Sequence, residues 1–184
     1  MTVLYSIGYG NRDWHMMLDL LQRRACQFLI DVRSSPYSKF NPTYNRESLA
    51  SLCGEQGIRY VFMGDVLGGK PGRQEHFDSE GKVDYVKLAE SEQFQLGLSR
   101  LKSAQGKGLV SFLMCSELKP EMCHRCKLIG AELSKHGIEI LHVDENGVDI
   151  GQGDAIDRLT HGQSDMFGIS PVLTRSRGSY GAKT

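Results

Sequence analysis

The sequence predicts a single α/β domain of three layers, in which a mostly parallel sheet of about five strands is flanked by helices. Short apolar runs alternate along the chain with segments whose apolar residues recur at helical spacing, as they do in β-α-β units. Two of these runs, QFLIDV at 27–32 and LVSFLM at 109–114, are apolar almost throughout. Strands that are covered by helices on both faces of a parallel sheet have this composition.

The other elements follow from shorter patterns. Three further β-prone runs predict strands at 3–7, 58–62 and 138–143. Four segments with apolar residues at helical spacing predict helices, over the residues after Asp13 and over 45–56, 85–105 and 120–136. Asp13 is a suitable N-cap for the first helix. Gly57 and Gly137 follow the second and the fourth, where glycine commonly ends a helix.

We expect the domain to span 1–160 and the rest of the chain, 161–184, to form a mobile C-terminal extension. Beyond Gly147 the patterns fade, apart from a short helical one at 155–159. The 184 residues are about the length of one domain, and neither an internal repeat nor a second domain is found.

The composition narrows the class of protein. A hydrophobic content of 40% with 24% charged residues is ordinary for a globular chain. Lys and Arg number 22, as do Asp and Glu, so the net charge is zero. A neutral chain exerts no long-range attraction on polyanions, so any contact with nucleic acid is expected through a local basic pocket.

The chain is expected to work in the cytoplasm and away from membranes. No apolar run approaches the ~20 residues of a membrane helix, and the first ten residues lack the pattern of a signal peptide. Five scattered cysteines are an odd number, which fits free thiols in a reducing compartment better than a disulfide framework.

A candidate site follows from the sheet. Ligands of open parallel sheets bind beyond the carboxyl ends of the strands. Several segments with reactive or ligand-binding residues fall at these ends or at the start of the next helix, namely 8–11, 31–34, 68–69, 115–117 and 123–125. We therefore expect these segments to meet at one edge of the sheet.

The candidate catalytic residues are a cysteine, a histidine and two carboxylates: Cys115, His124, Asp31 and Glu117. Cys115 ends the most apolar strand and precedes a helix, where the dipole and nearby arginines favour a nucleophilic thiolate. It could instead be a small apolar residue at the end of a buried strand. Asp31, Glu117 and His124 are candidates for proton transfer, although Asp31 could instead only cap a turn or pair with Arg12.

The candidate anion-binding residues are Arg33 and Arg125, supported by polar and glycine positions nearby: Gly8, Tyr9, Asn11, Ser34, Gly68 and Gly69. A guanidinium beside a helix start binds phosphate or carboxylate in bidentate fashion. The glycines allow close approach of backbone, and Tyr9 could stack on a base. The alternative for Arg33 is an internal salt bridge with Asp31 or Glu117.

We predict no metal and no cofactor. Cys123 and Cys126 form a Cys-x-x-Cys, and Cys115 lies a short loop away, so three thiols and an imidazole could in principle hold zinc. A structural zinc site usually takes a second pair of ligands from elsewhere, however, and the sequence offers none. Cys126 shares a helical face with Ile129 and Leu133, which indicates a core position.

Several motifs together resemble one family. They are SIGYGN at 6–11, LIDVRSSP at 29–36, LGG at 67–69, LMCSE at 113–117 with Pro120 and CHR at 123–125, and HV at 142–143 with Gly147. In this order they are similar to the family named domain of unknown function 488, over about 3–159. The resemblance implies an α/β domain without an established reaction, and some members are loosely described as DNA-repair proteins.

A more distant likeness is to rhodaneses, in which an Asp-x-Arg ends an early strand and a cysteine ends a later one. The loop from Cys115 to Arg125 is longer than a rhodanese loop and contains Pro120, which weakens the case for sulfur transfer. We expect an enzyme acting on a phosphate-bearing nucleotide or nucleic-acid substrate. The alternatives are a non-catalytic nucleotide-sensing or nucleic-acid-binding module and rhodanese-like sulfur transfer. The sequence gives no oligomeric state.

Overall fold

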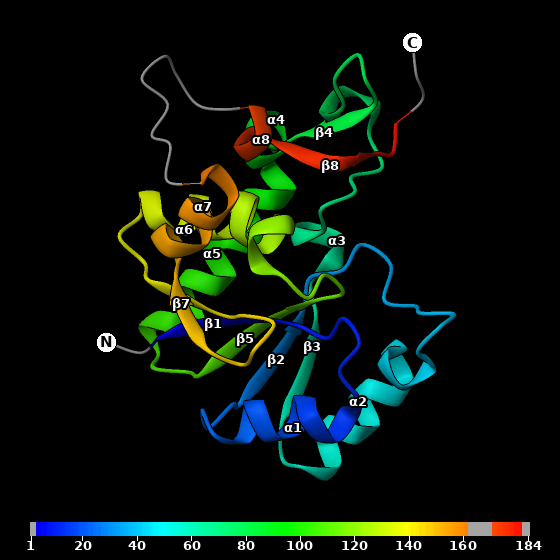
Figure 1. Ribbon diagram of the computed structural model, residues 1–184, viewed down its shortest axis with the longest axis vertical. Helices are drawn as coiled ribbons and strands as arrows, with labels where there is room; N and C mark the ends of the chain where they lie inside the picture. The colour runs from blue at the N-terminus through cyan, green and yellow to red at the C-terminus, as the bar shows by residue number, and fades with distance from the viewer. Residues whose placement is uncertain (1–2, 162–170, 182–184) are drawn as a thin grey trace.

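The computed structural model describes residues 3–161 and 171–181 and confirms the predicted fold class (Figure 1). A six-stranded sheet has the order β3-β2-β5-β1-β6-β7. Its first five strands are parallel, and β7 pairs with β6 in antiparallel fashion. The strands are β1 (Leu4–Gly8), β2 (Phe28–Asp31), β3 (Arg59–Phe62), β5 (Ser111–Cys115), β6 (Ile140–Val143) and β7 (Asp149–Gly151). The five parallel strands are the predicted ones.

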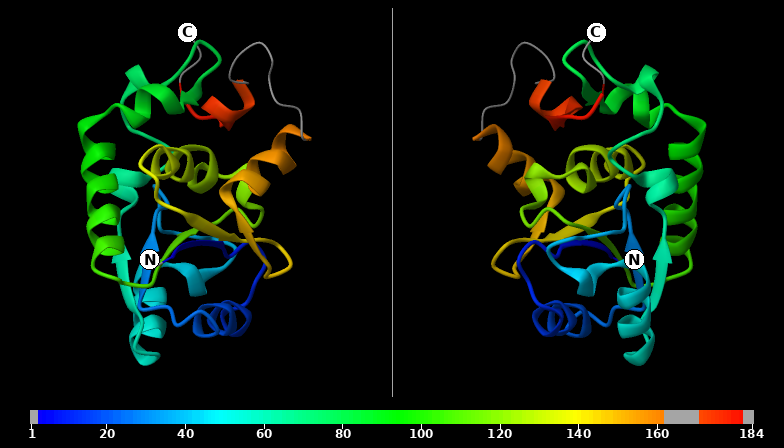
Figure 2. Two further views of the ribbon diagram at one scale, coloured as in Figure 1. Left: turned by 90° about the vertical axis from the view of Figure 1, so that its left-hand side faces the viewer. Right: turned by 90° about the vertical axis from the view of Figure 1, so that its right-hand side faces the viewer.

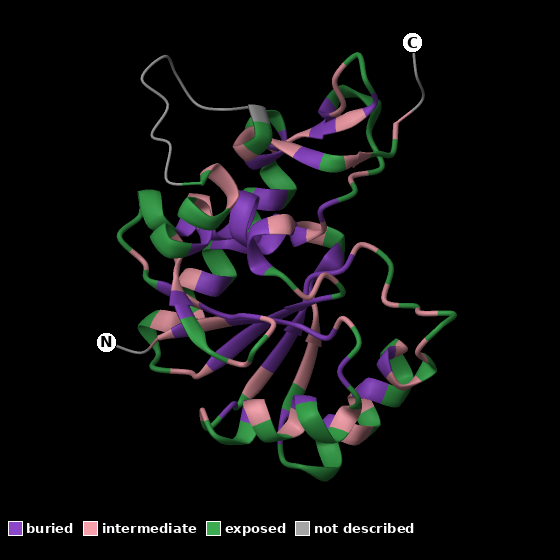
Figure 3. Ribbon diagram, viewed as in Figure 1, coloured by how far each residue is buried: buried purple, intermediate pink, exposed green. Residues whose placement is uncertain are grey.

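Helices cover both faces of the sheet, so the domain has three layers (Figure 2). One face carries α1 (Trp14–Gln22) and α2 (Arg46–Glu55), which pack on Ile7, Leu29 and Met114. The other face carries α5 (Glu92–Gly106) and the helix of residues 125–135, which pack on a second apolar cluster. The strand residues alternate between the two clusters because successive side chains of a strand point to opposite faces. Figure 3 shows the buried strands between the exposed helix surfaces.

Local signals in the sequence explain most helix boundaries. The Asp13 side chain accepts a hydrogen bond of 2.8 Å from the backbone amide of Met16, as expected of an N-cap. Gly57 and Gly137 adopt positive φ angles of 70° and 68° behind their helices. Such angles favour glycine, which has no Cβ to clash with the backbone.

Two predicted helices are interrupted. The segment 85–105 forms α4 (Tyr85–Ala89) and α5, because Ser91 starts a new helix by accepting the amide of Phe94. The segment 120–136 contains a 3-10 turn (η3, Pro120–Met122), a π-helical stretch (η4, Arg125–Gly130) and α6 (Ala131–Lys135). An extended Cys123, with φ −116° and ψ 150°, separates the first two.

The remaining elements are short or lie late in the chain. They are the 3-10 turns η1 (Pro42–Tyr44) and η2 (Gln74–His76), α3 (Gly64–Leu67), β4 (Lys82–Asp84), α7 (Gln152–Thr160), α8 (Pro171–Thr174) and β8 (Arg175–Ser179). Strands β4 and β8 form a separate antiparallel pair. None of the helices within 3–161 and 171–181 has the length and apolar character needed to cross a bilayer.

The predicted extension, 161–184, lies partly outside the described residues, at 162–170 and 182–184. Its described part, 171–181, contains α8 and β8. The Lys127 ammonium fixes this segment by donating hydrogen bonds of 3.0 and 2.7 Å to the carbonyls of Val172 and Arg175. The buried Ser176 hydroxyl accepts a hydrogen bond from the amide of Val83. These contacts bring β8 to the same end of the domain as the candidate site.

Candidate functional site

A pocket of about 270 Å³ lies beyond the carboxyl ends of the adjacent strands β2, β5 and β1. Parallel strands present their carboxyl ends at one edge of the sheet, where ligands of such folds bind. The pocket is lined by Tyr9, Arg33, Ser34, Ser35, Tyr37, Gly69, Lys70, Tyr85, Cys115, Ser116, Glu117, Met122, Cys123, His124, Ser176, Arg177 and Tyr180. Seven of the twelve residues predicted for the site are among them.

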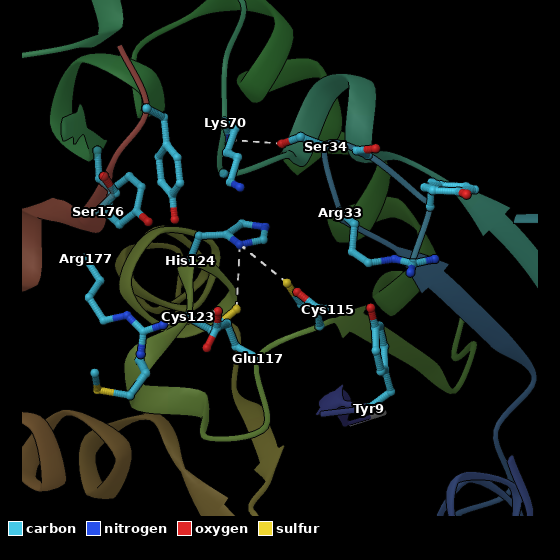
Figure 4. Close-up of a pocket in the computed structure, with 17 residues that line it drawn as sticks. Tyr9, Arg33, Ser34, Lys70, Cys115, Glu117, Cys123, His124, Ser176 and Arg177 are labelled. Carbon is cyan, nitrogen blue, oxygen red and sulfur yellow. Dashed lines mark hydrogen bonds and ion pairs between the residues drawn. The ribbon is translucent and has the colours of Figure 1, made fainter. Parts of the chain in front are cut away.

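Two thiols and an imidazole form a cluster on the pocket wall (Figure 4). Cys115 ends β5, and its Sγ lies 3.8 Å from the Nδ1 of His124. The Sγ of Cys123 lies 3.6 Å from the same nitrogen. We call Cys115, Cys123 and His124 the thiol–imidazole cluster; all three residues are buried and border the pocket.

The cluster forms at the break in the predicted helix. Pro120 begins a single 3-10 turn, and the extended backbone of Cys123 then starts a new helical segment at His124. Cys123 and His124 lie at this junction, and the His124 ring reaches the sulfur of Cys115 at the end of β5.

The tautomer of His124 follows from its second nitrogen. The Nε2 atom lies 3.1 Å from the backbone oxygen of Val32, the residue after β2. A carbonyl oxygen only accepts hydrogen bonds, so Nε2 carries a proton and donates it. In the neutral ring, Nδ1 therefore presents its lone pair to the sulfurs of Cys115 and Cys123.

The pKa values of the two thiols in the cluster are shifted in opposite directions. A hydrogen bond from Cys123 holds the pKa of Cys115 well below its ordinary value, against the effect of burial and with help from His124 and Arg125. Burial raises the pKa of Cys123, and the neighbouring Cys115 adds to that rise. Cys115 is therefore the more acidic thiol of the pair, and Cys123 is the hydrogen-bond donor.

Asp31 and Arg33 form a buried ion pair at the end of β2. The Arg33 guanidinium donates through Nε and Nη2 to both carboxylate oxygens of Asp31, at 2.9 and 2.6 Å, and from Nη2 to the carbonyl of Tyr44. Tyr60 donates a third hydrogen bond to Asp31, at 2.7 Å. Arg33 borders the pocket, whereas Asp31 is fully buried beneath it. The internal salt bridge considered for Arg33 is present.

Charged side chains from three segments line the mouth of the pocket. Lys70 is in the loop after α3, and its Nζ atom lies 4.1 Å from the ring centre of Tyr180. Arg177 of β8 forms an ion pair with Glu117 at 3.6 Å, and both side chains are partly exposed. The backbone amide of Lys70 also donates to the Ser34 hydroxyl at 2.9 Å, which joins the loop to the end of β2.

Arg125 lies inside the domain and outside the pocket lining. It is fully buried, and its Nη2 donates hydrogen bonds of 2.9 Å to the carbonyls of Glu117 and Leu118. Its Nε and Nη1 atoms have no hydrogen-bond partner within the described residues. Arg125 therefore holds the loop that follows Cys115 in its course.

The glycines of the predicted site allow close contacts within the protein. A Cβ on Gly8 would clash with the carbonyl of Glu117, and one on Gly68 with the Ser34 hydroxyl. A Cβ on Gly69 would lie 2.6 Å from Cγ of His124. Only Gly69 borders the pocket, while Gly68 lies near a smaller cavity and Asn11 is exposed at another place.

Several residues that line the pocket were not predicted from the sequence. Lys70, Tyr85, Ser176, Arg177 and Tyr180 border the pocket, and Cys123 belongs to the cluster. The arginine at 177 was visible as part of a basic tail, but its partner Glu117 lies 60 residues away in sequence. Cys126, by contrast, is buried with Ile150 and Ala155, as its helical spacing indicated.

The cluster is the one group of three potential metal ligands found among the described residues. Its two sulfurs and one ring nitrogen lie within 4.8 Å of one another. All five cysteines of the chain are free thiols. The cluster can therefore offer soft ligands to a metal, a nucleophile to a substrate, or a dithiol to an oxidant.

Comparison with known proteins gives one match. The family model described as "Domain of unknown function DUF488" matches residues 13–131, which include the end of β2, Cys115 and the thiol–imidazole cluster. No curated protein and no solved structure matches significantly. The matched segment covers well over half of the chain, which therefore belongs to the DUF488 family.

Proposed function

We propose that this protein is an enzyme that acts on a phosphate-bearing nucleotide or nucleic-acid component bound in the pocket. The observation that carries this proposal is the lining, in which three cationic side chains and four tyrosines surround the thiol–imidazole cluster. Cationic side chains bind phosphate through charge-assisted hydrogen bonds, and aromatic rings stack on nucleobases. A cysteine and a histidine beside them supply reactive groups.

Lys70 and Arg177 are the phosphate-binding residues of this proposal. Both side chains are exposed at the pocket mouth, so they can move to meet a ligand at little cost in desolvation. Glu117 forms an ion pair with Arg177, so an incoming phosphate would compete with the Glu117 carboxylate for the Arg177 guanidinium. Arg33 adds a guanidinium whose Nη1 has no hydrogen-bond partner in the described part of the chain. Asp31 offsets its charge, so Arg33 serves mainly as a fixed donor.

The aromatic lining favours a nucleoside over a simple phosphate. Tyr37 is 69% exposed and Tyr180 is 49% exposed, so both rings are available to a base. Tyr9 is held by stacking on Tyr44, with ring centres 4.1 Å apart. Base–aromatic stacking contributes about 1–3 kcal/mol per base. The volume of about 270 Å³ is at the small end of ligand pockets, which favours one nucleotide unit.

The reactive groups are assigned by their position. The thiol–imidazole cluster and the Glu117 carboxylate border the pocket, so they are the groups that touch a bound substrate. Proton transfer is assigned to Glu117 or His124. Asp31 orients Arg33 from below, and Arg125 shapes the loop. The cysteines are all unpaired, which is consistent with work in a reducing compartment such as the cytoplasm.

A thermal-shift screen tests the binding half of the proposal. Nucleoside monophosphates, nucleosides, inorganic phosphate and oligonucleotides with damaged bases are added to the wild type and to K70A and R177A. A ligand at 100 times its dissociation constant adds about 2.7 kcal/mol, or several degrees in melting temperature. We expect a shift in the wild type that both variants reduce and that K107A and R100A, which remove exposed charges elsewhere, retain. No shift with any ligand contradicts the proposal.

Turnover separates an enzyme from a binding module. In an enzyme, E117Q removes a proton-transfer group while it also frees Arg177, so binding is kept and conversion of the ligand falls. A module binds the same ligand without converting it in either form. A chain that instead converts thiosulfate and cyanide to sulfite and thiocyanate performs sulfur transfer. Damaged-base oligonucleotides as the preferred ligand would support a part in DNA repair.

A further inference from the structure

We propose that Cys115, Cys123 and His124 bind one Zn²⁺ ion, with the fourth coordination position open to the pocket. The ion would be held through the two thiolate sulfurs and the Nδ1 of the imidazole. This inference departs from the expectation of no metal drawn from the sequence, and it does not depend on the proposed binding of a phosphate-bearing ligand. The three ligand atoms lie within 4.8 Å of one another, and all three residues border the pocket.

The distances fit a tetrahedral ion. With Zn–S about 2.3 Å and Zn–N about 2.0 Å, tetrahedral angles separate sulfur and nitrogen by about 3.5 Å. The observed separations between Nδ1 and the two sulfurs are 3.6 Å for Cys123 and 3.8 Å for Cys115. Figure 4 shows both sulfurs turned toward the same side of the ring. All three atoms lie within 4.8 Å of one another, so a single ion can bind them after a modest shift of the side chains.

The histidine is held in the tautomer that a metal requires. Its Nε2 proton is donated to the carbonyl of Val32 at 3.1 Å, which leaves the lone pair on Nδ1. Metal-binding histidines almost always donate their other ring proton in this way, commonly to a backbone carbonyl or a carboxylate. Gly69 packs against the imidazole from another side, since a Cβ there would lie 2.9 Å from Nδ1. The ring orientation is thus fixed before any ion binds.

The ligand set indicates zinc in an open site. Thiolate sulfur and imidazole nitrogen together are typical ligands of Zn²⁺, and Mg²⁺ and Ca²⁺ prefer oxygen. Within the described residues, no fourth Cys, His, Asp or Glu belongs to the group. Three protein ligands with a free fourth position are the pattern of catalytic zinc, whereas structural sites have four. In this arrangement Cys115 and His124 are metal ligands, so proton transfer falls to Glu117, and the fourth position faces the pocket.

Cobalt substitution tests the proposal. The full chain is reduced, freed of metal with a chelator and titrated with Co²⁺. We expect one ion per chain, with sulfur-to-cobalt charge-transfer bands and the strong visible bands of tetrahedral cobalt, and displacement by one equivalent of Zn²⁺. X-ray absorption of the zinc form should show two sulfurs near 2.3 Å and lighter ligands near 2.0 Å. Absence of stoichiometric uptake, or a zinc ion without sulfur ligands, overturns the proposal.

Variants locate the ion. C123S and H124N should each weaken Zn²⁺ binding by at least about 100-fold, since each removes a direct ligand and the loss of outer-shell groups alone costs 10–100-fold. C53A, which removes a buried thiol on the inner face of α2, is the matched control and should bind zinc like the wild type. Equal affinity in C123S and wild type contradicts the assignment. The wild-type absorption spectrum decides the matter if a variant does not fold.

These measurements need no nucleotide and no turnover. If the chain binds zinc but no phosphate-bearing ligand, the metal site is supported and the proposed function is rejected. If it binds such a ligand but no zinc, only the metal site is rejected. An open position has its own test, because azide added to the cobalt form should shift the visible bands. Unchanged bands would show that the fourth position is closed.

Discussion

The Nε2 of His124 lies 3.1 Å from the backbone oxygen of Val32, a contact that joins the start of η4 to the end of β2. It sets which nitrogen of the imidazole carries the proton, and it therefore directs Nδ1 to Cys115 and Cys123. The reactive side of the pocket depends on this one contact between a side chain and a backbone carbonyl.

Substitution of Gly69 by Ala should displace the His124 ring. The added Cβ would lie 2.6 to 2.9 Å from three atoms of the His124 side chain, so the ring must turn away from Val32 or from the sulfurs. We expect at least a tenfold loss of zinc affinity in G69A, of the size reported for outer-shell changes. Titration of the metal-free protein with Zn²⁺ measures it.

Gly72 provides the control for this substitution. It lies in the same loop, and a Cβ there would meet no atom within 4 Å. G72A should therefore bind zinc like the wild type. Equal zinc affinity in G69A and G72A would mean that the ring position does not depend on Gly69.

Removing the charge of Asp31 should destabilise the domain more than removing its hydrogen bond from Tyr60. Asp31 is fully buried and Arg33 is 4% exposed, so D31N leaves an uncompensated buried guanidinium, at a cost of about 3–5 kcal/mol. Y60F removes one hydrogen bond to Asp31 and should cost about 1 kcal/mol. Urea unfolding of the two variants compares these free energies. A larger loss in Y60F would contradict this account of the ion pair.

Arg125 is predicted to act on stability. R125A removes two hydrogen bonds from a charged group to the carbonyls of Glu117 and Leu118, which should cost about 3 kcal/mol. Thermal unfolding measures the loss, and R100A, at an exposed position on α5, should melt like the wild type. If R125A kept the wild-type melting temperature and only lost affinity for the ligand, Arg125 would be a binding residue.

The free energy of unfolding should decrease as the pH is lowered, because His142 is buried in its neutral form. Burial lowers the pKa of His142 from 6.5 to about 4, while its ring lies 2.5 Å from the Ser6 hydroxyl and 2.7 Å from Gln152. The unfolded chain takes up a proton below pH 6.5 and the folded chain does not. The contribution is thus complete above pH 6.5 and is lost as the pH falls to about 4, a change of about 3 kcal/mol.

Unfolding free energies between pH 7 and pH 4 test this dependence. The slope should be smaller in H142Q than in the wild type, and H136Q, at an exposed histidine, should leave it unchanged. An unaltered slope in H142Q would mean that other groups cause the loss of stability.

The strands of the main sheet and part of the candidate site could be predicted from the sequence. Continuous apolar runs identified the two buried strands, and because parallel strands end at one edge, Cys115 and Arg33 could be expected to meet. The complete burial of the Arg125 side chain could not be predicted from the sequence. Its helical segment begins after an extended residue, Cys123, and this turns the guanidinium inward beneath the loop.

Other features depend on contacts between distant segments. The pairing of β4 with β8 joins runs of three and five residues, which are too short for a periodic signal. Lys70 and Arg177 reach the pocket only because the loop after α3 and the segment docked by Lys127 lie at the same end. Neither charge differs in the sequence from an ordinary surface residue.

A paired calorimetric titration tests the central claim most directly. Each nucleoside and its monophosphate are titrated into the wild type and into the double variant K70A/R177A. The account predicts that one monophosphate binds the wild type at least about 10-fold more tightly than its nucleoside, or about 1.4 kcal/mol. This difference should shrink in the double variant. Equal affinity for nucleoside and monophosphate, or no binding of either, would contradict a phosphate site in this pocket.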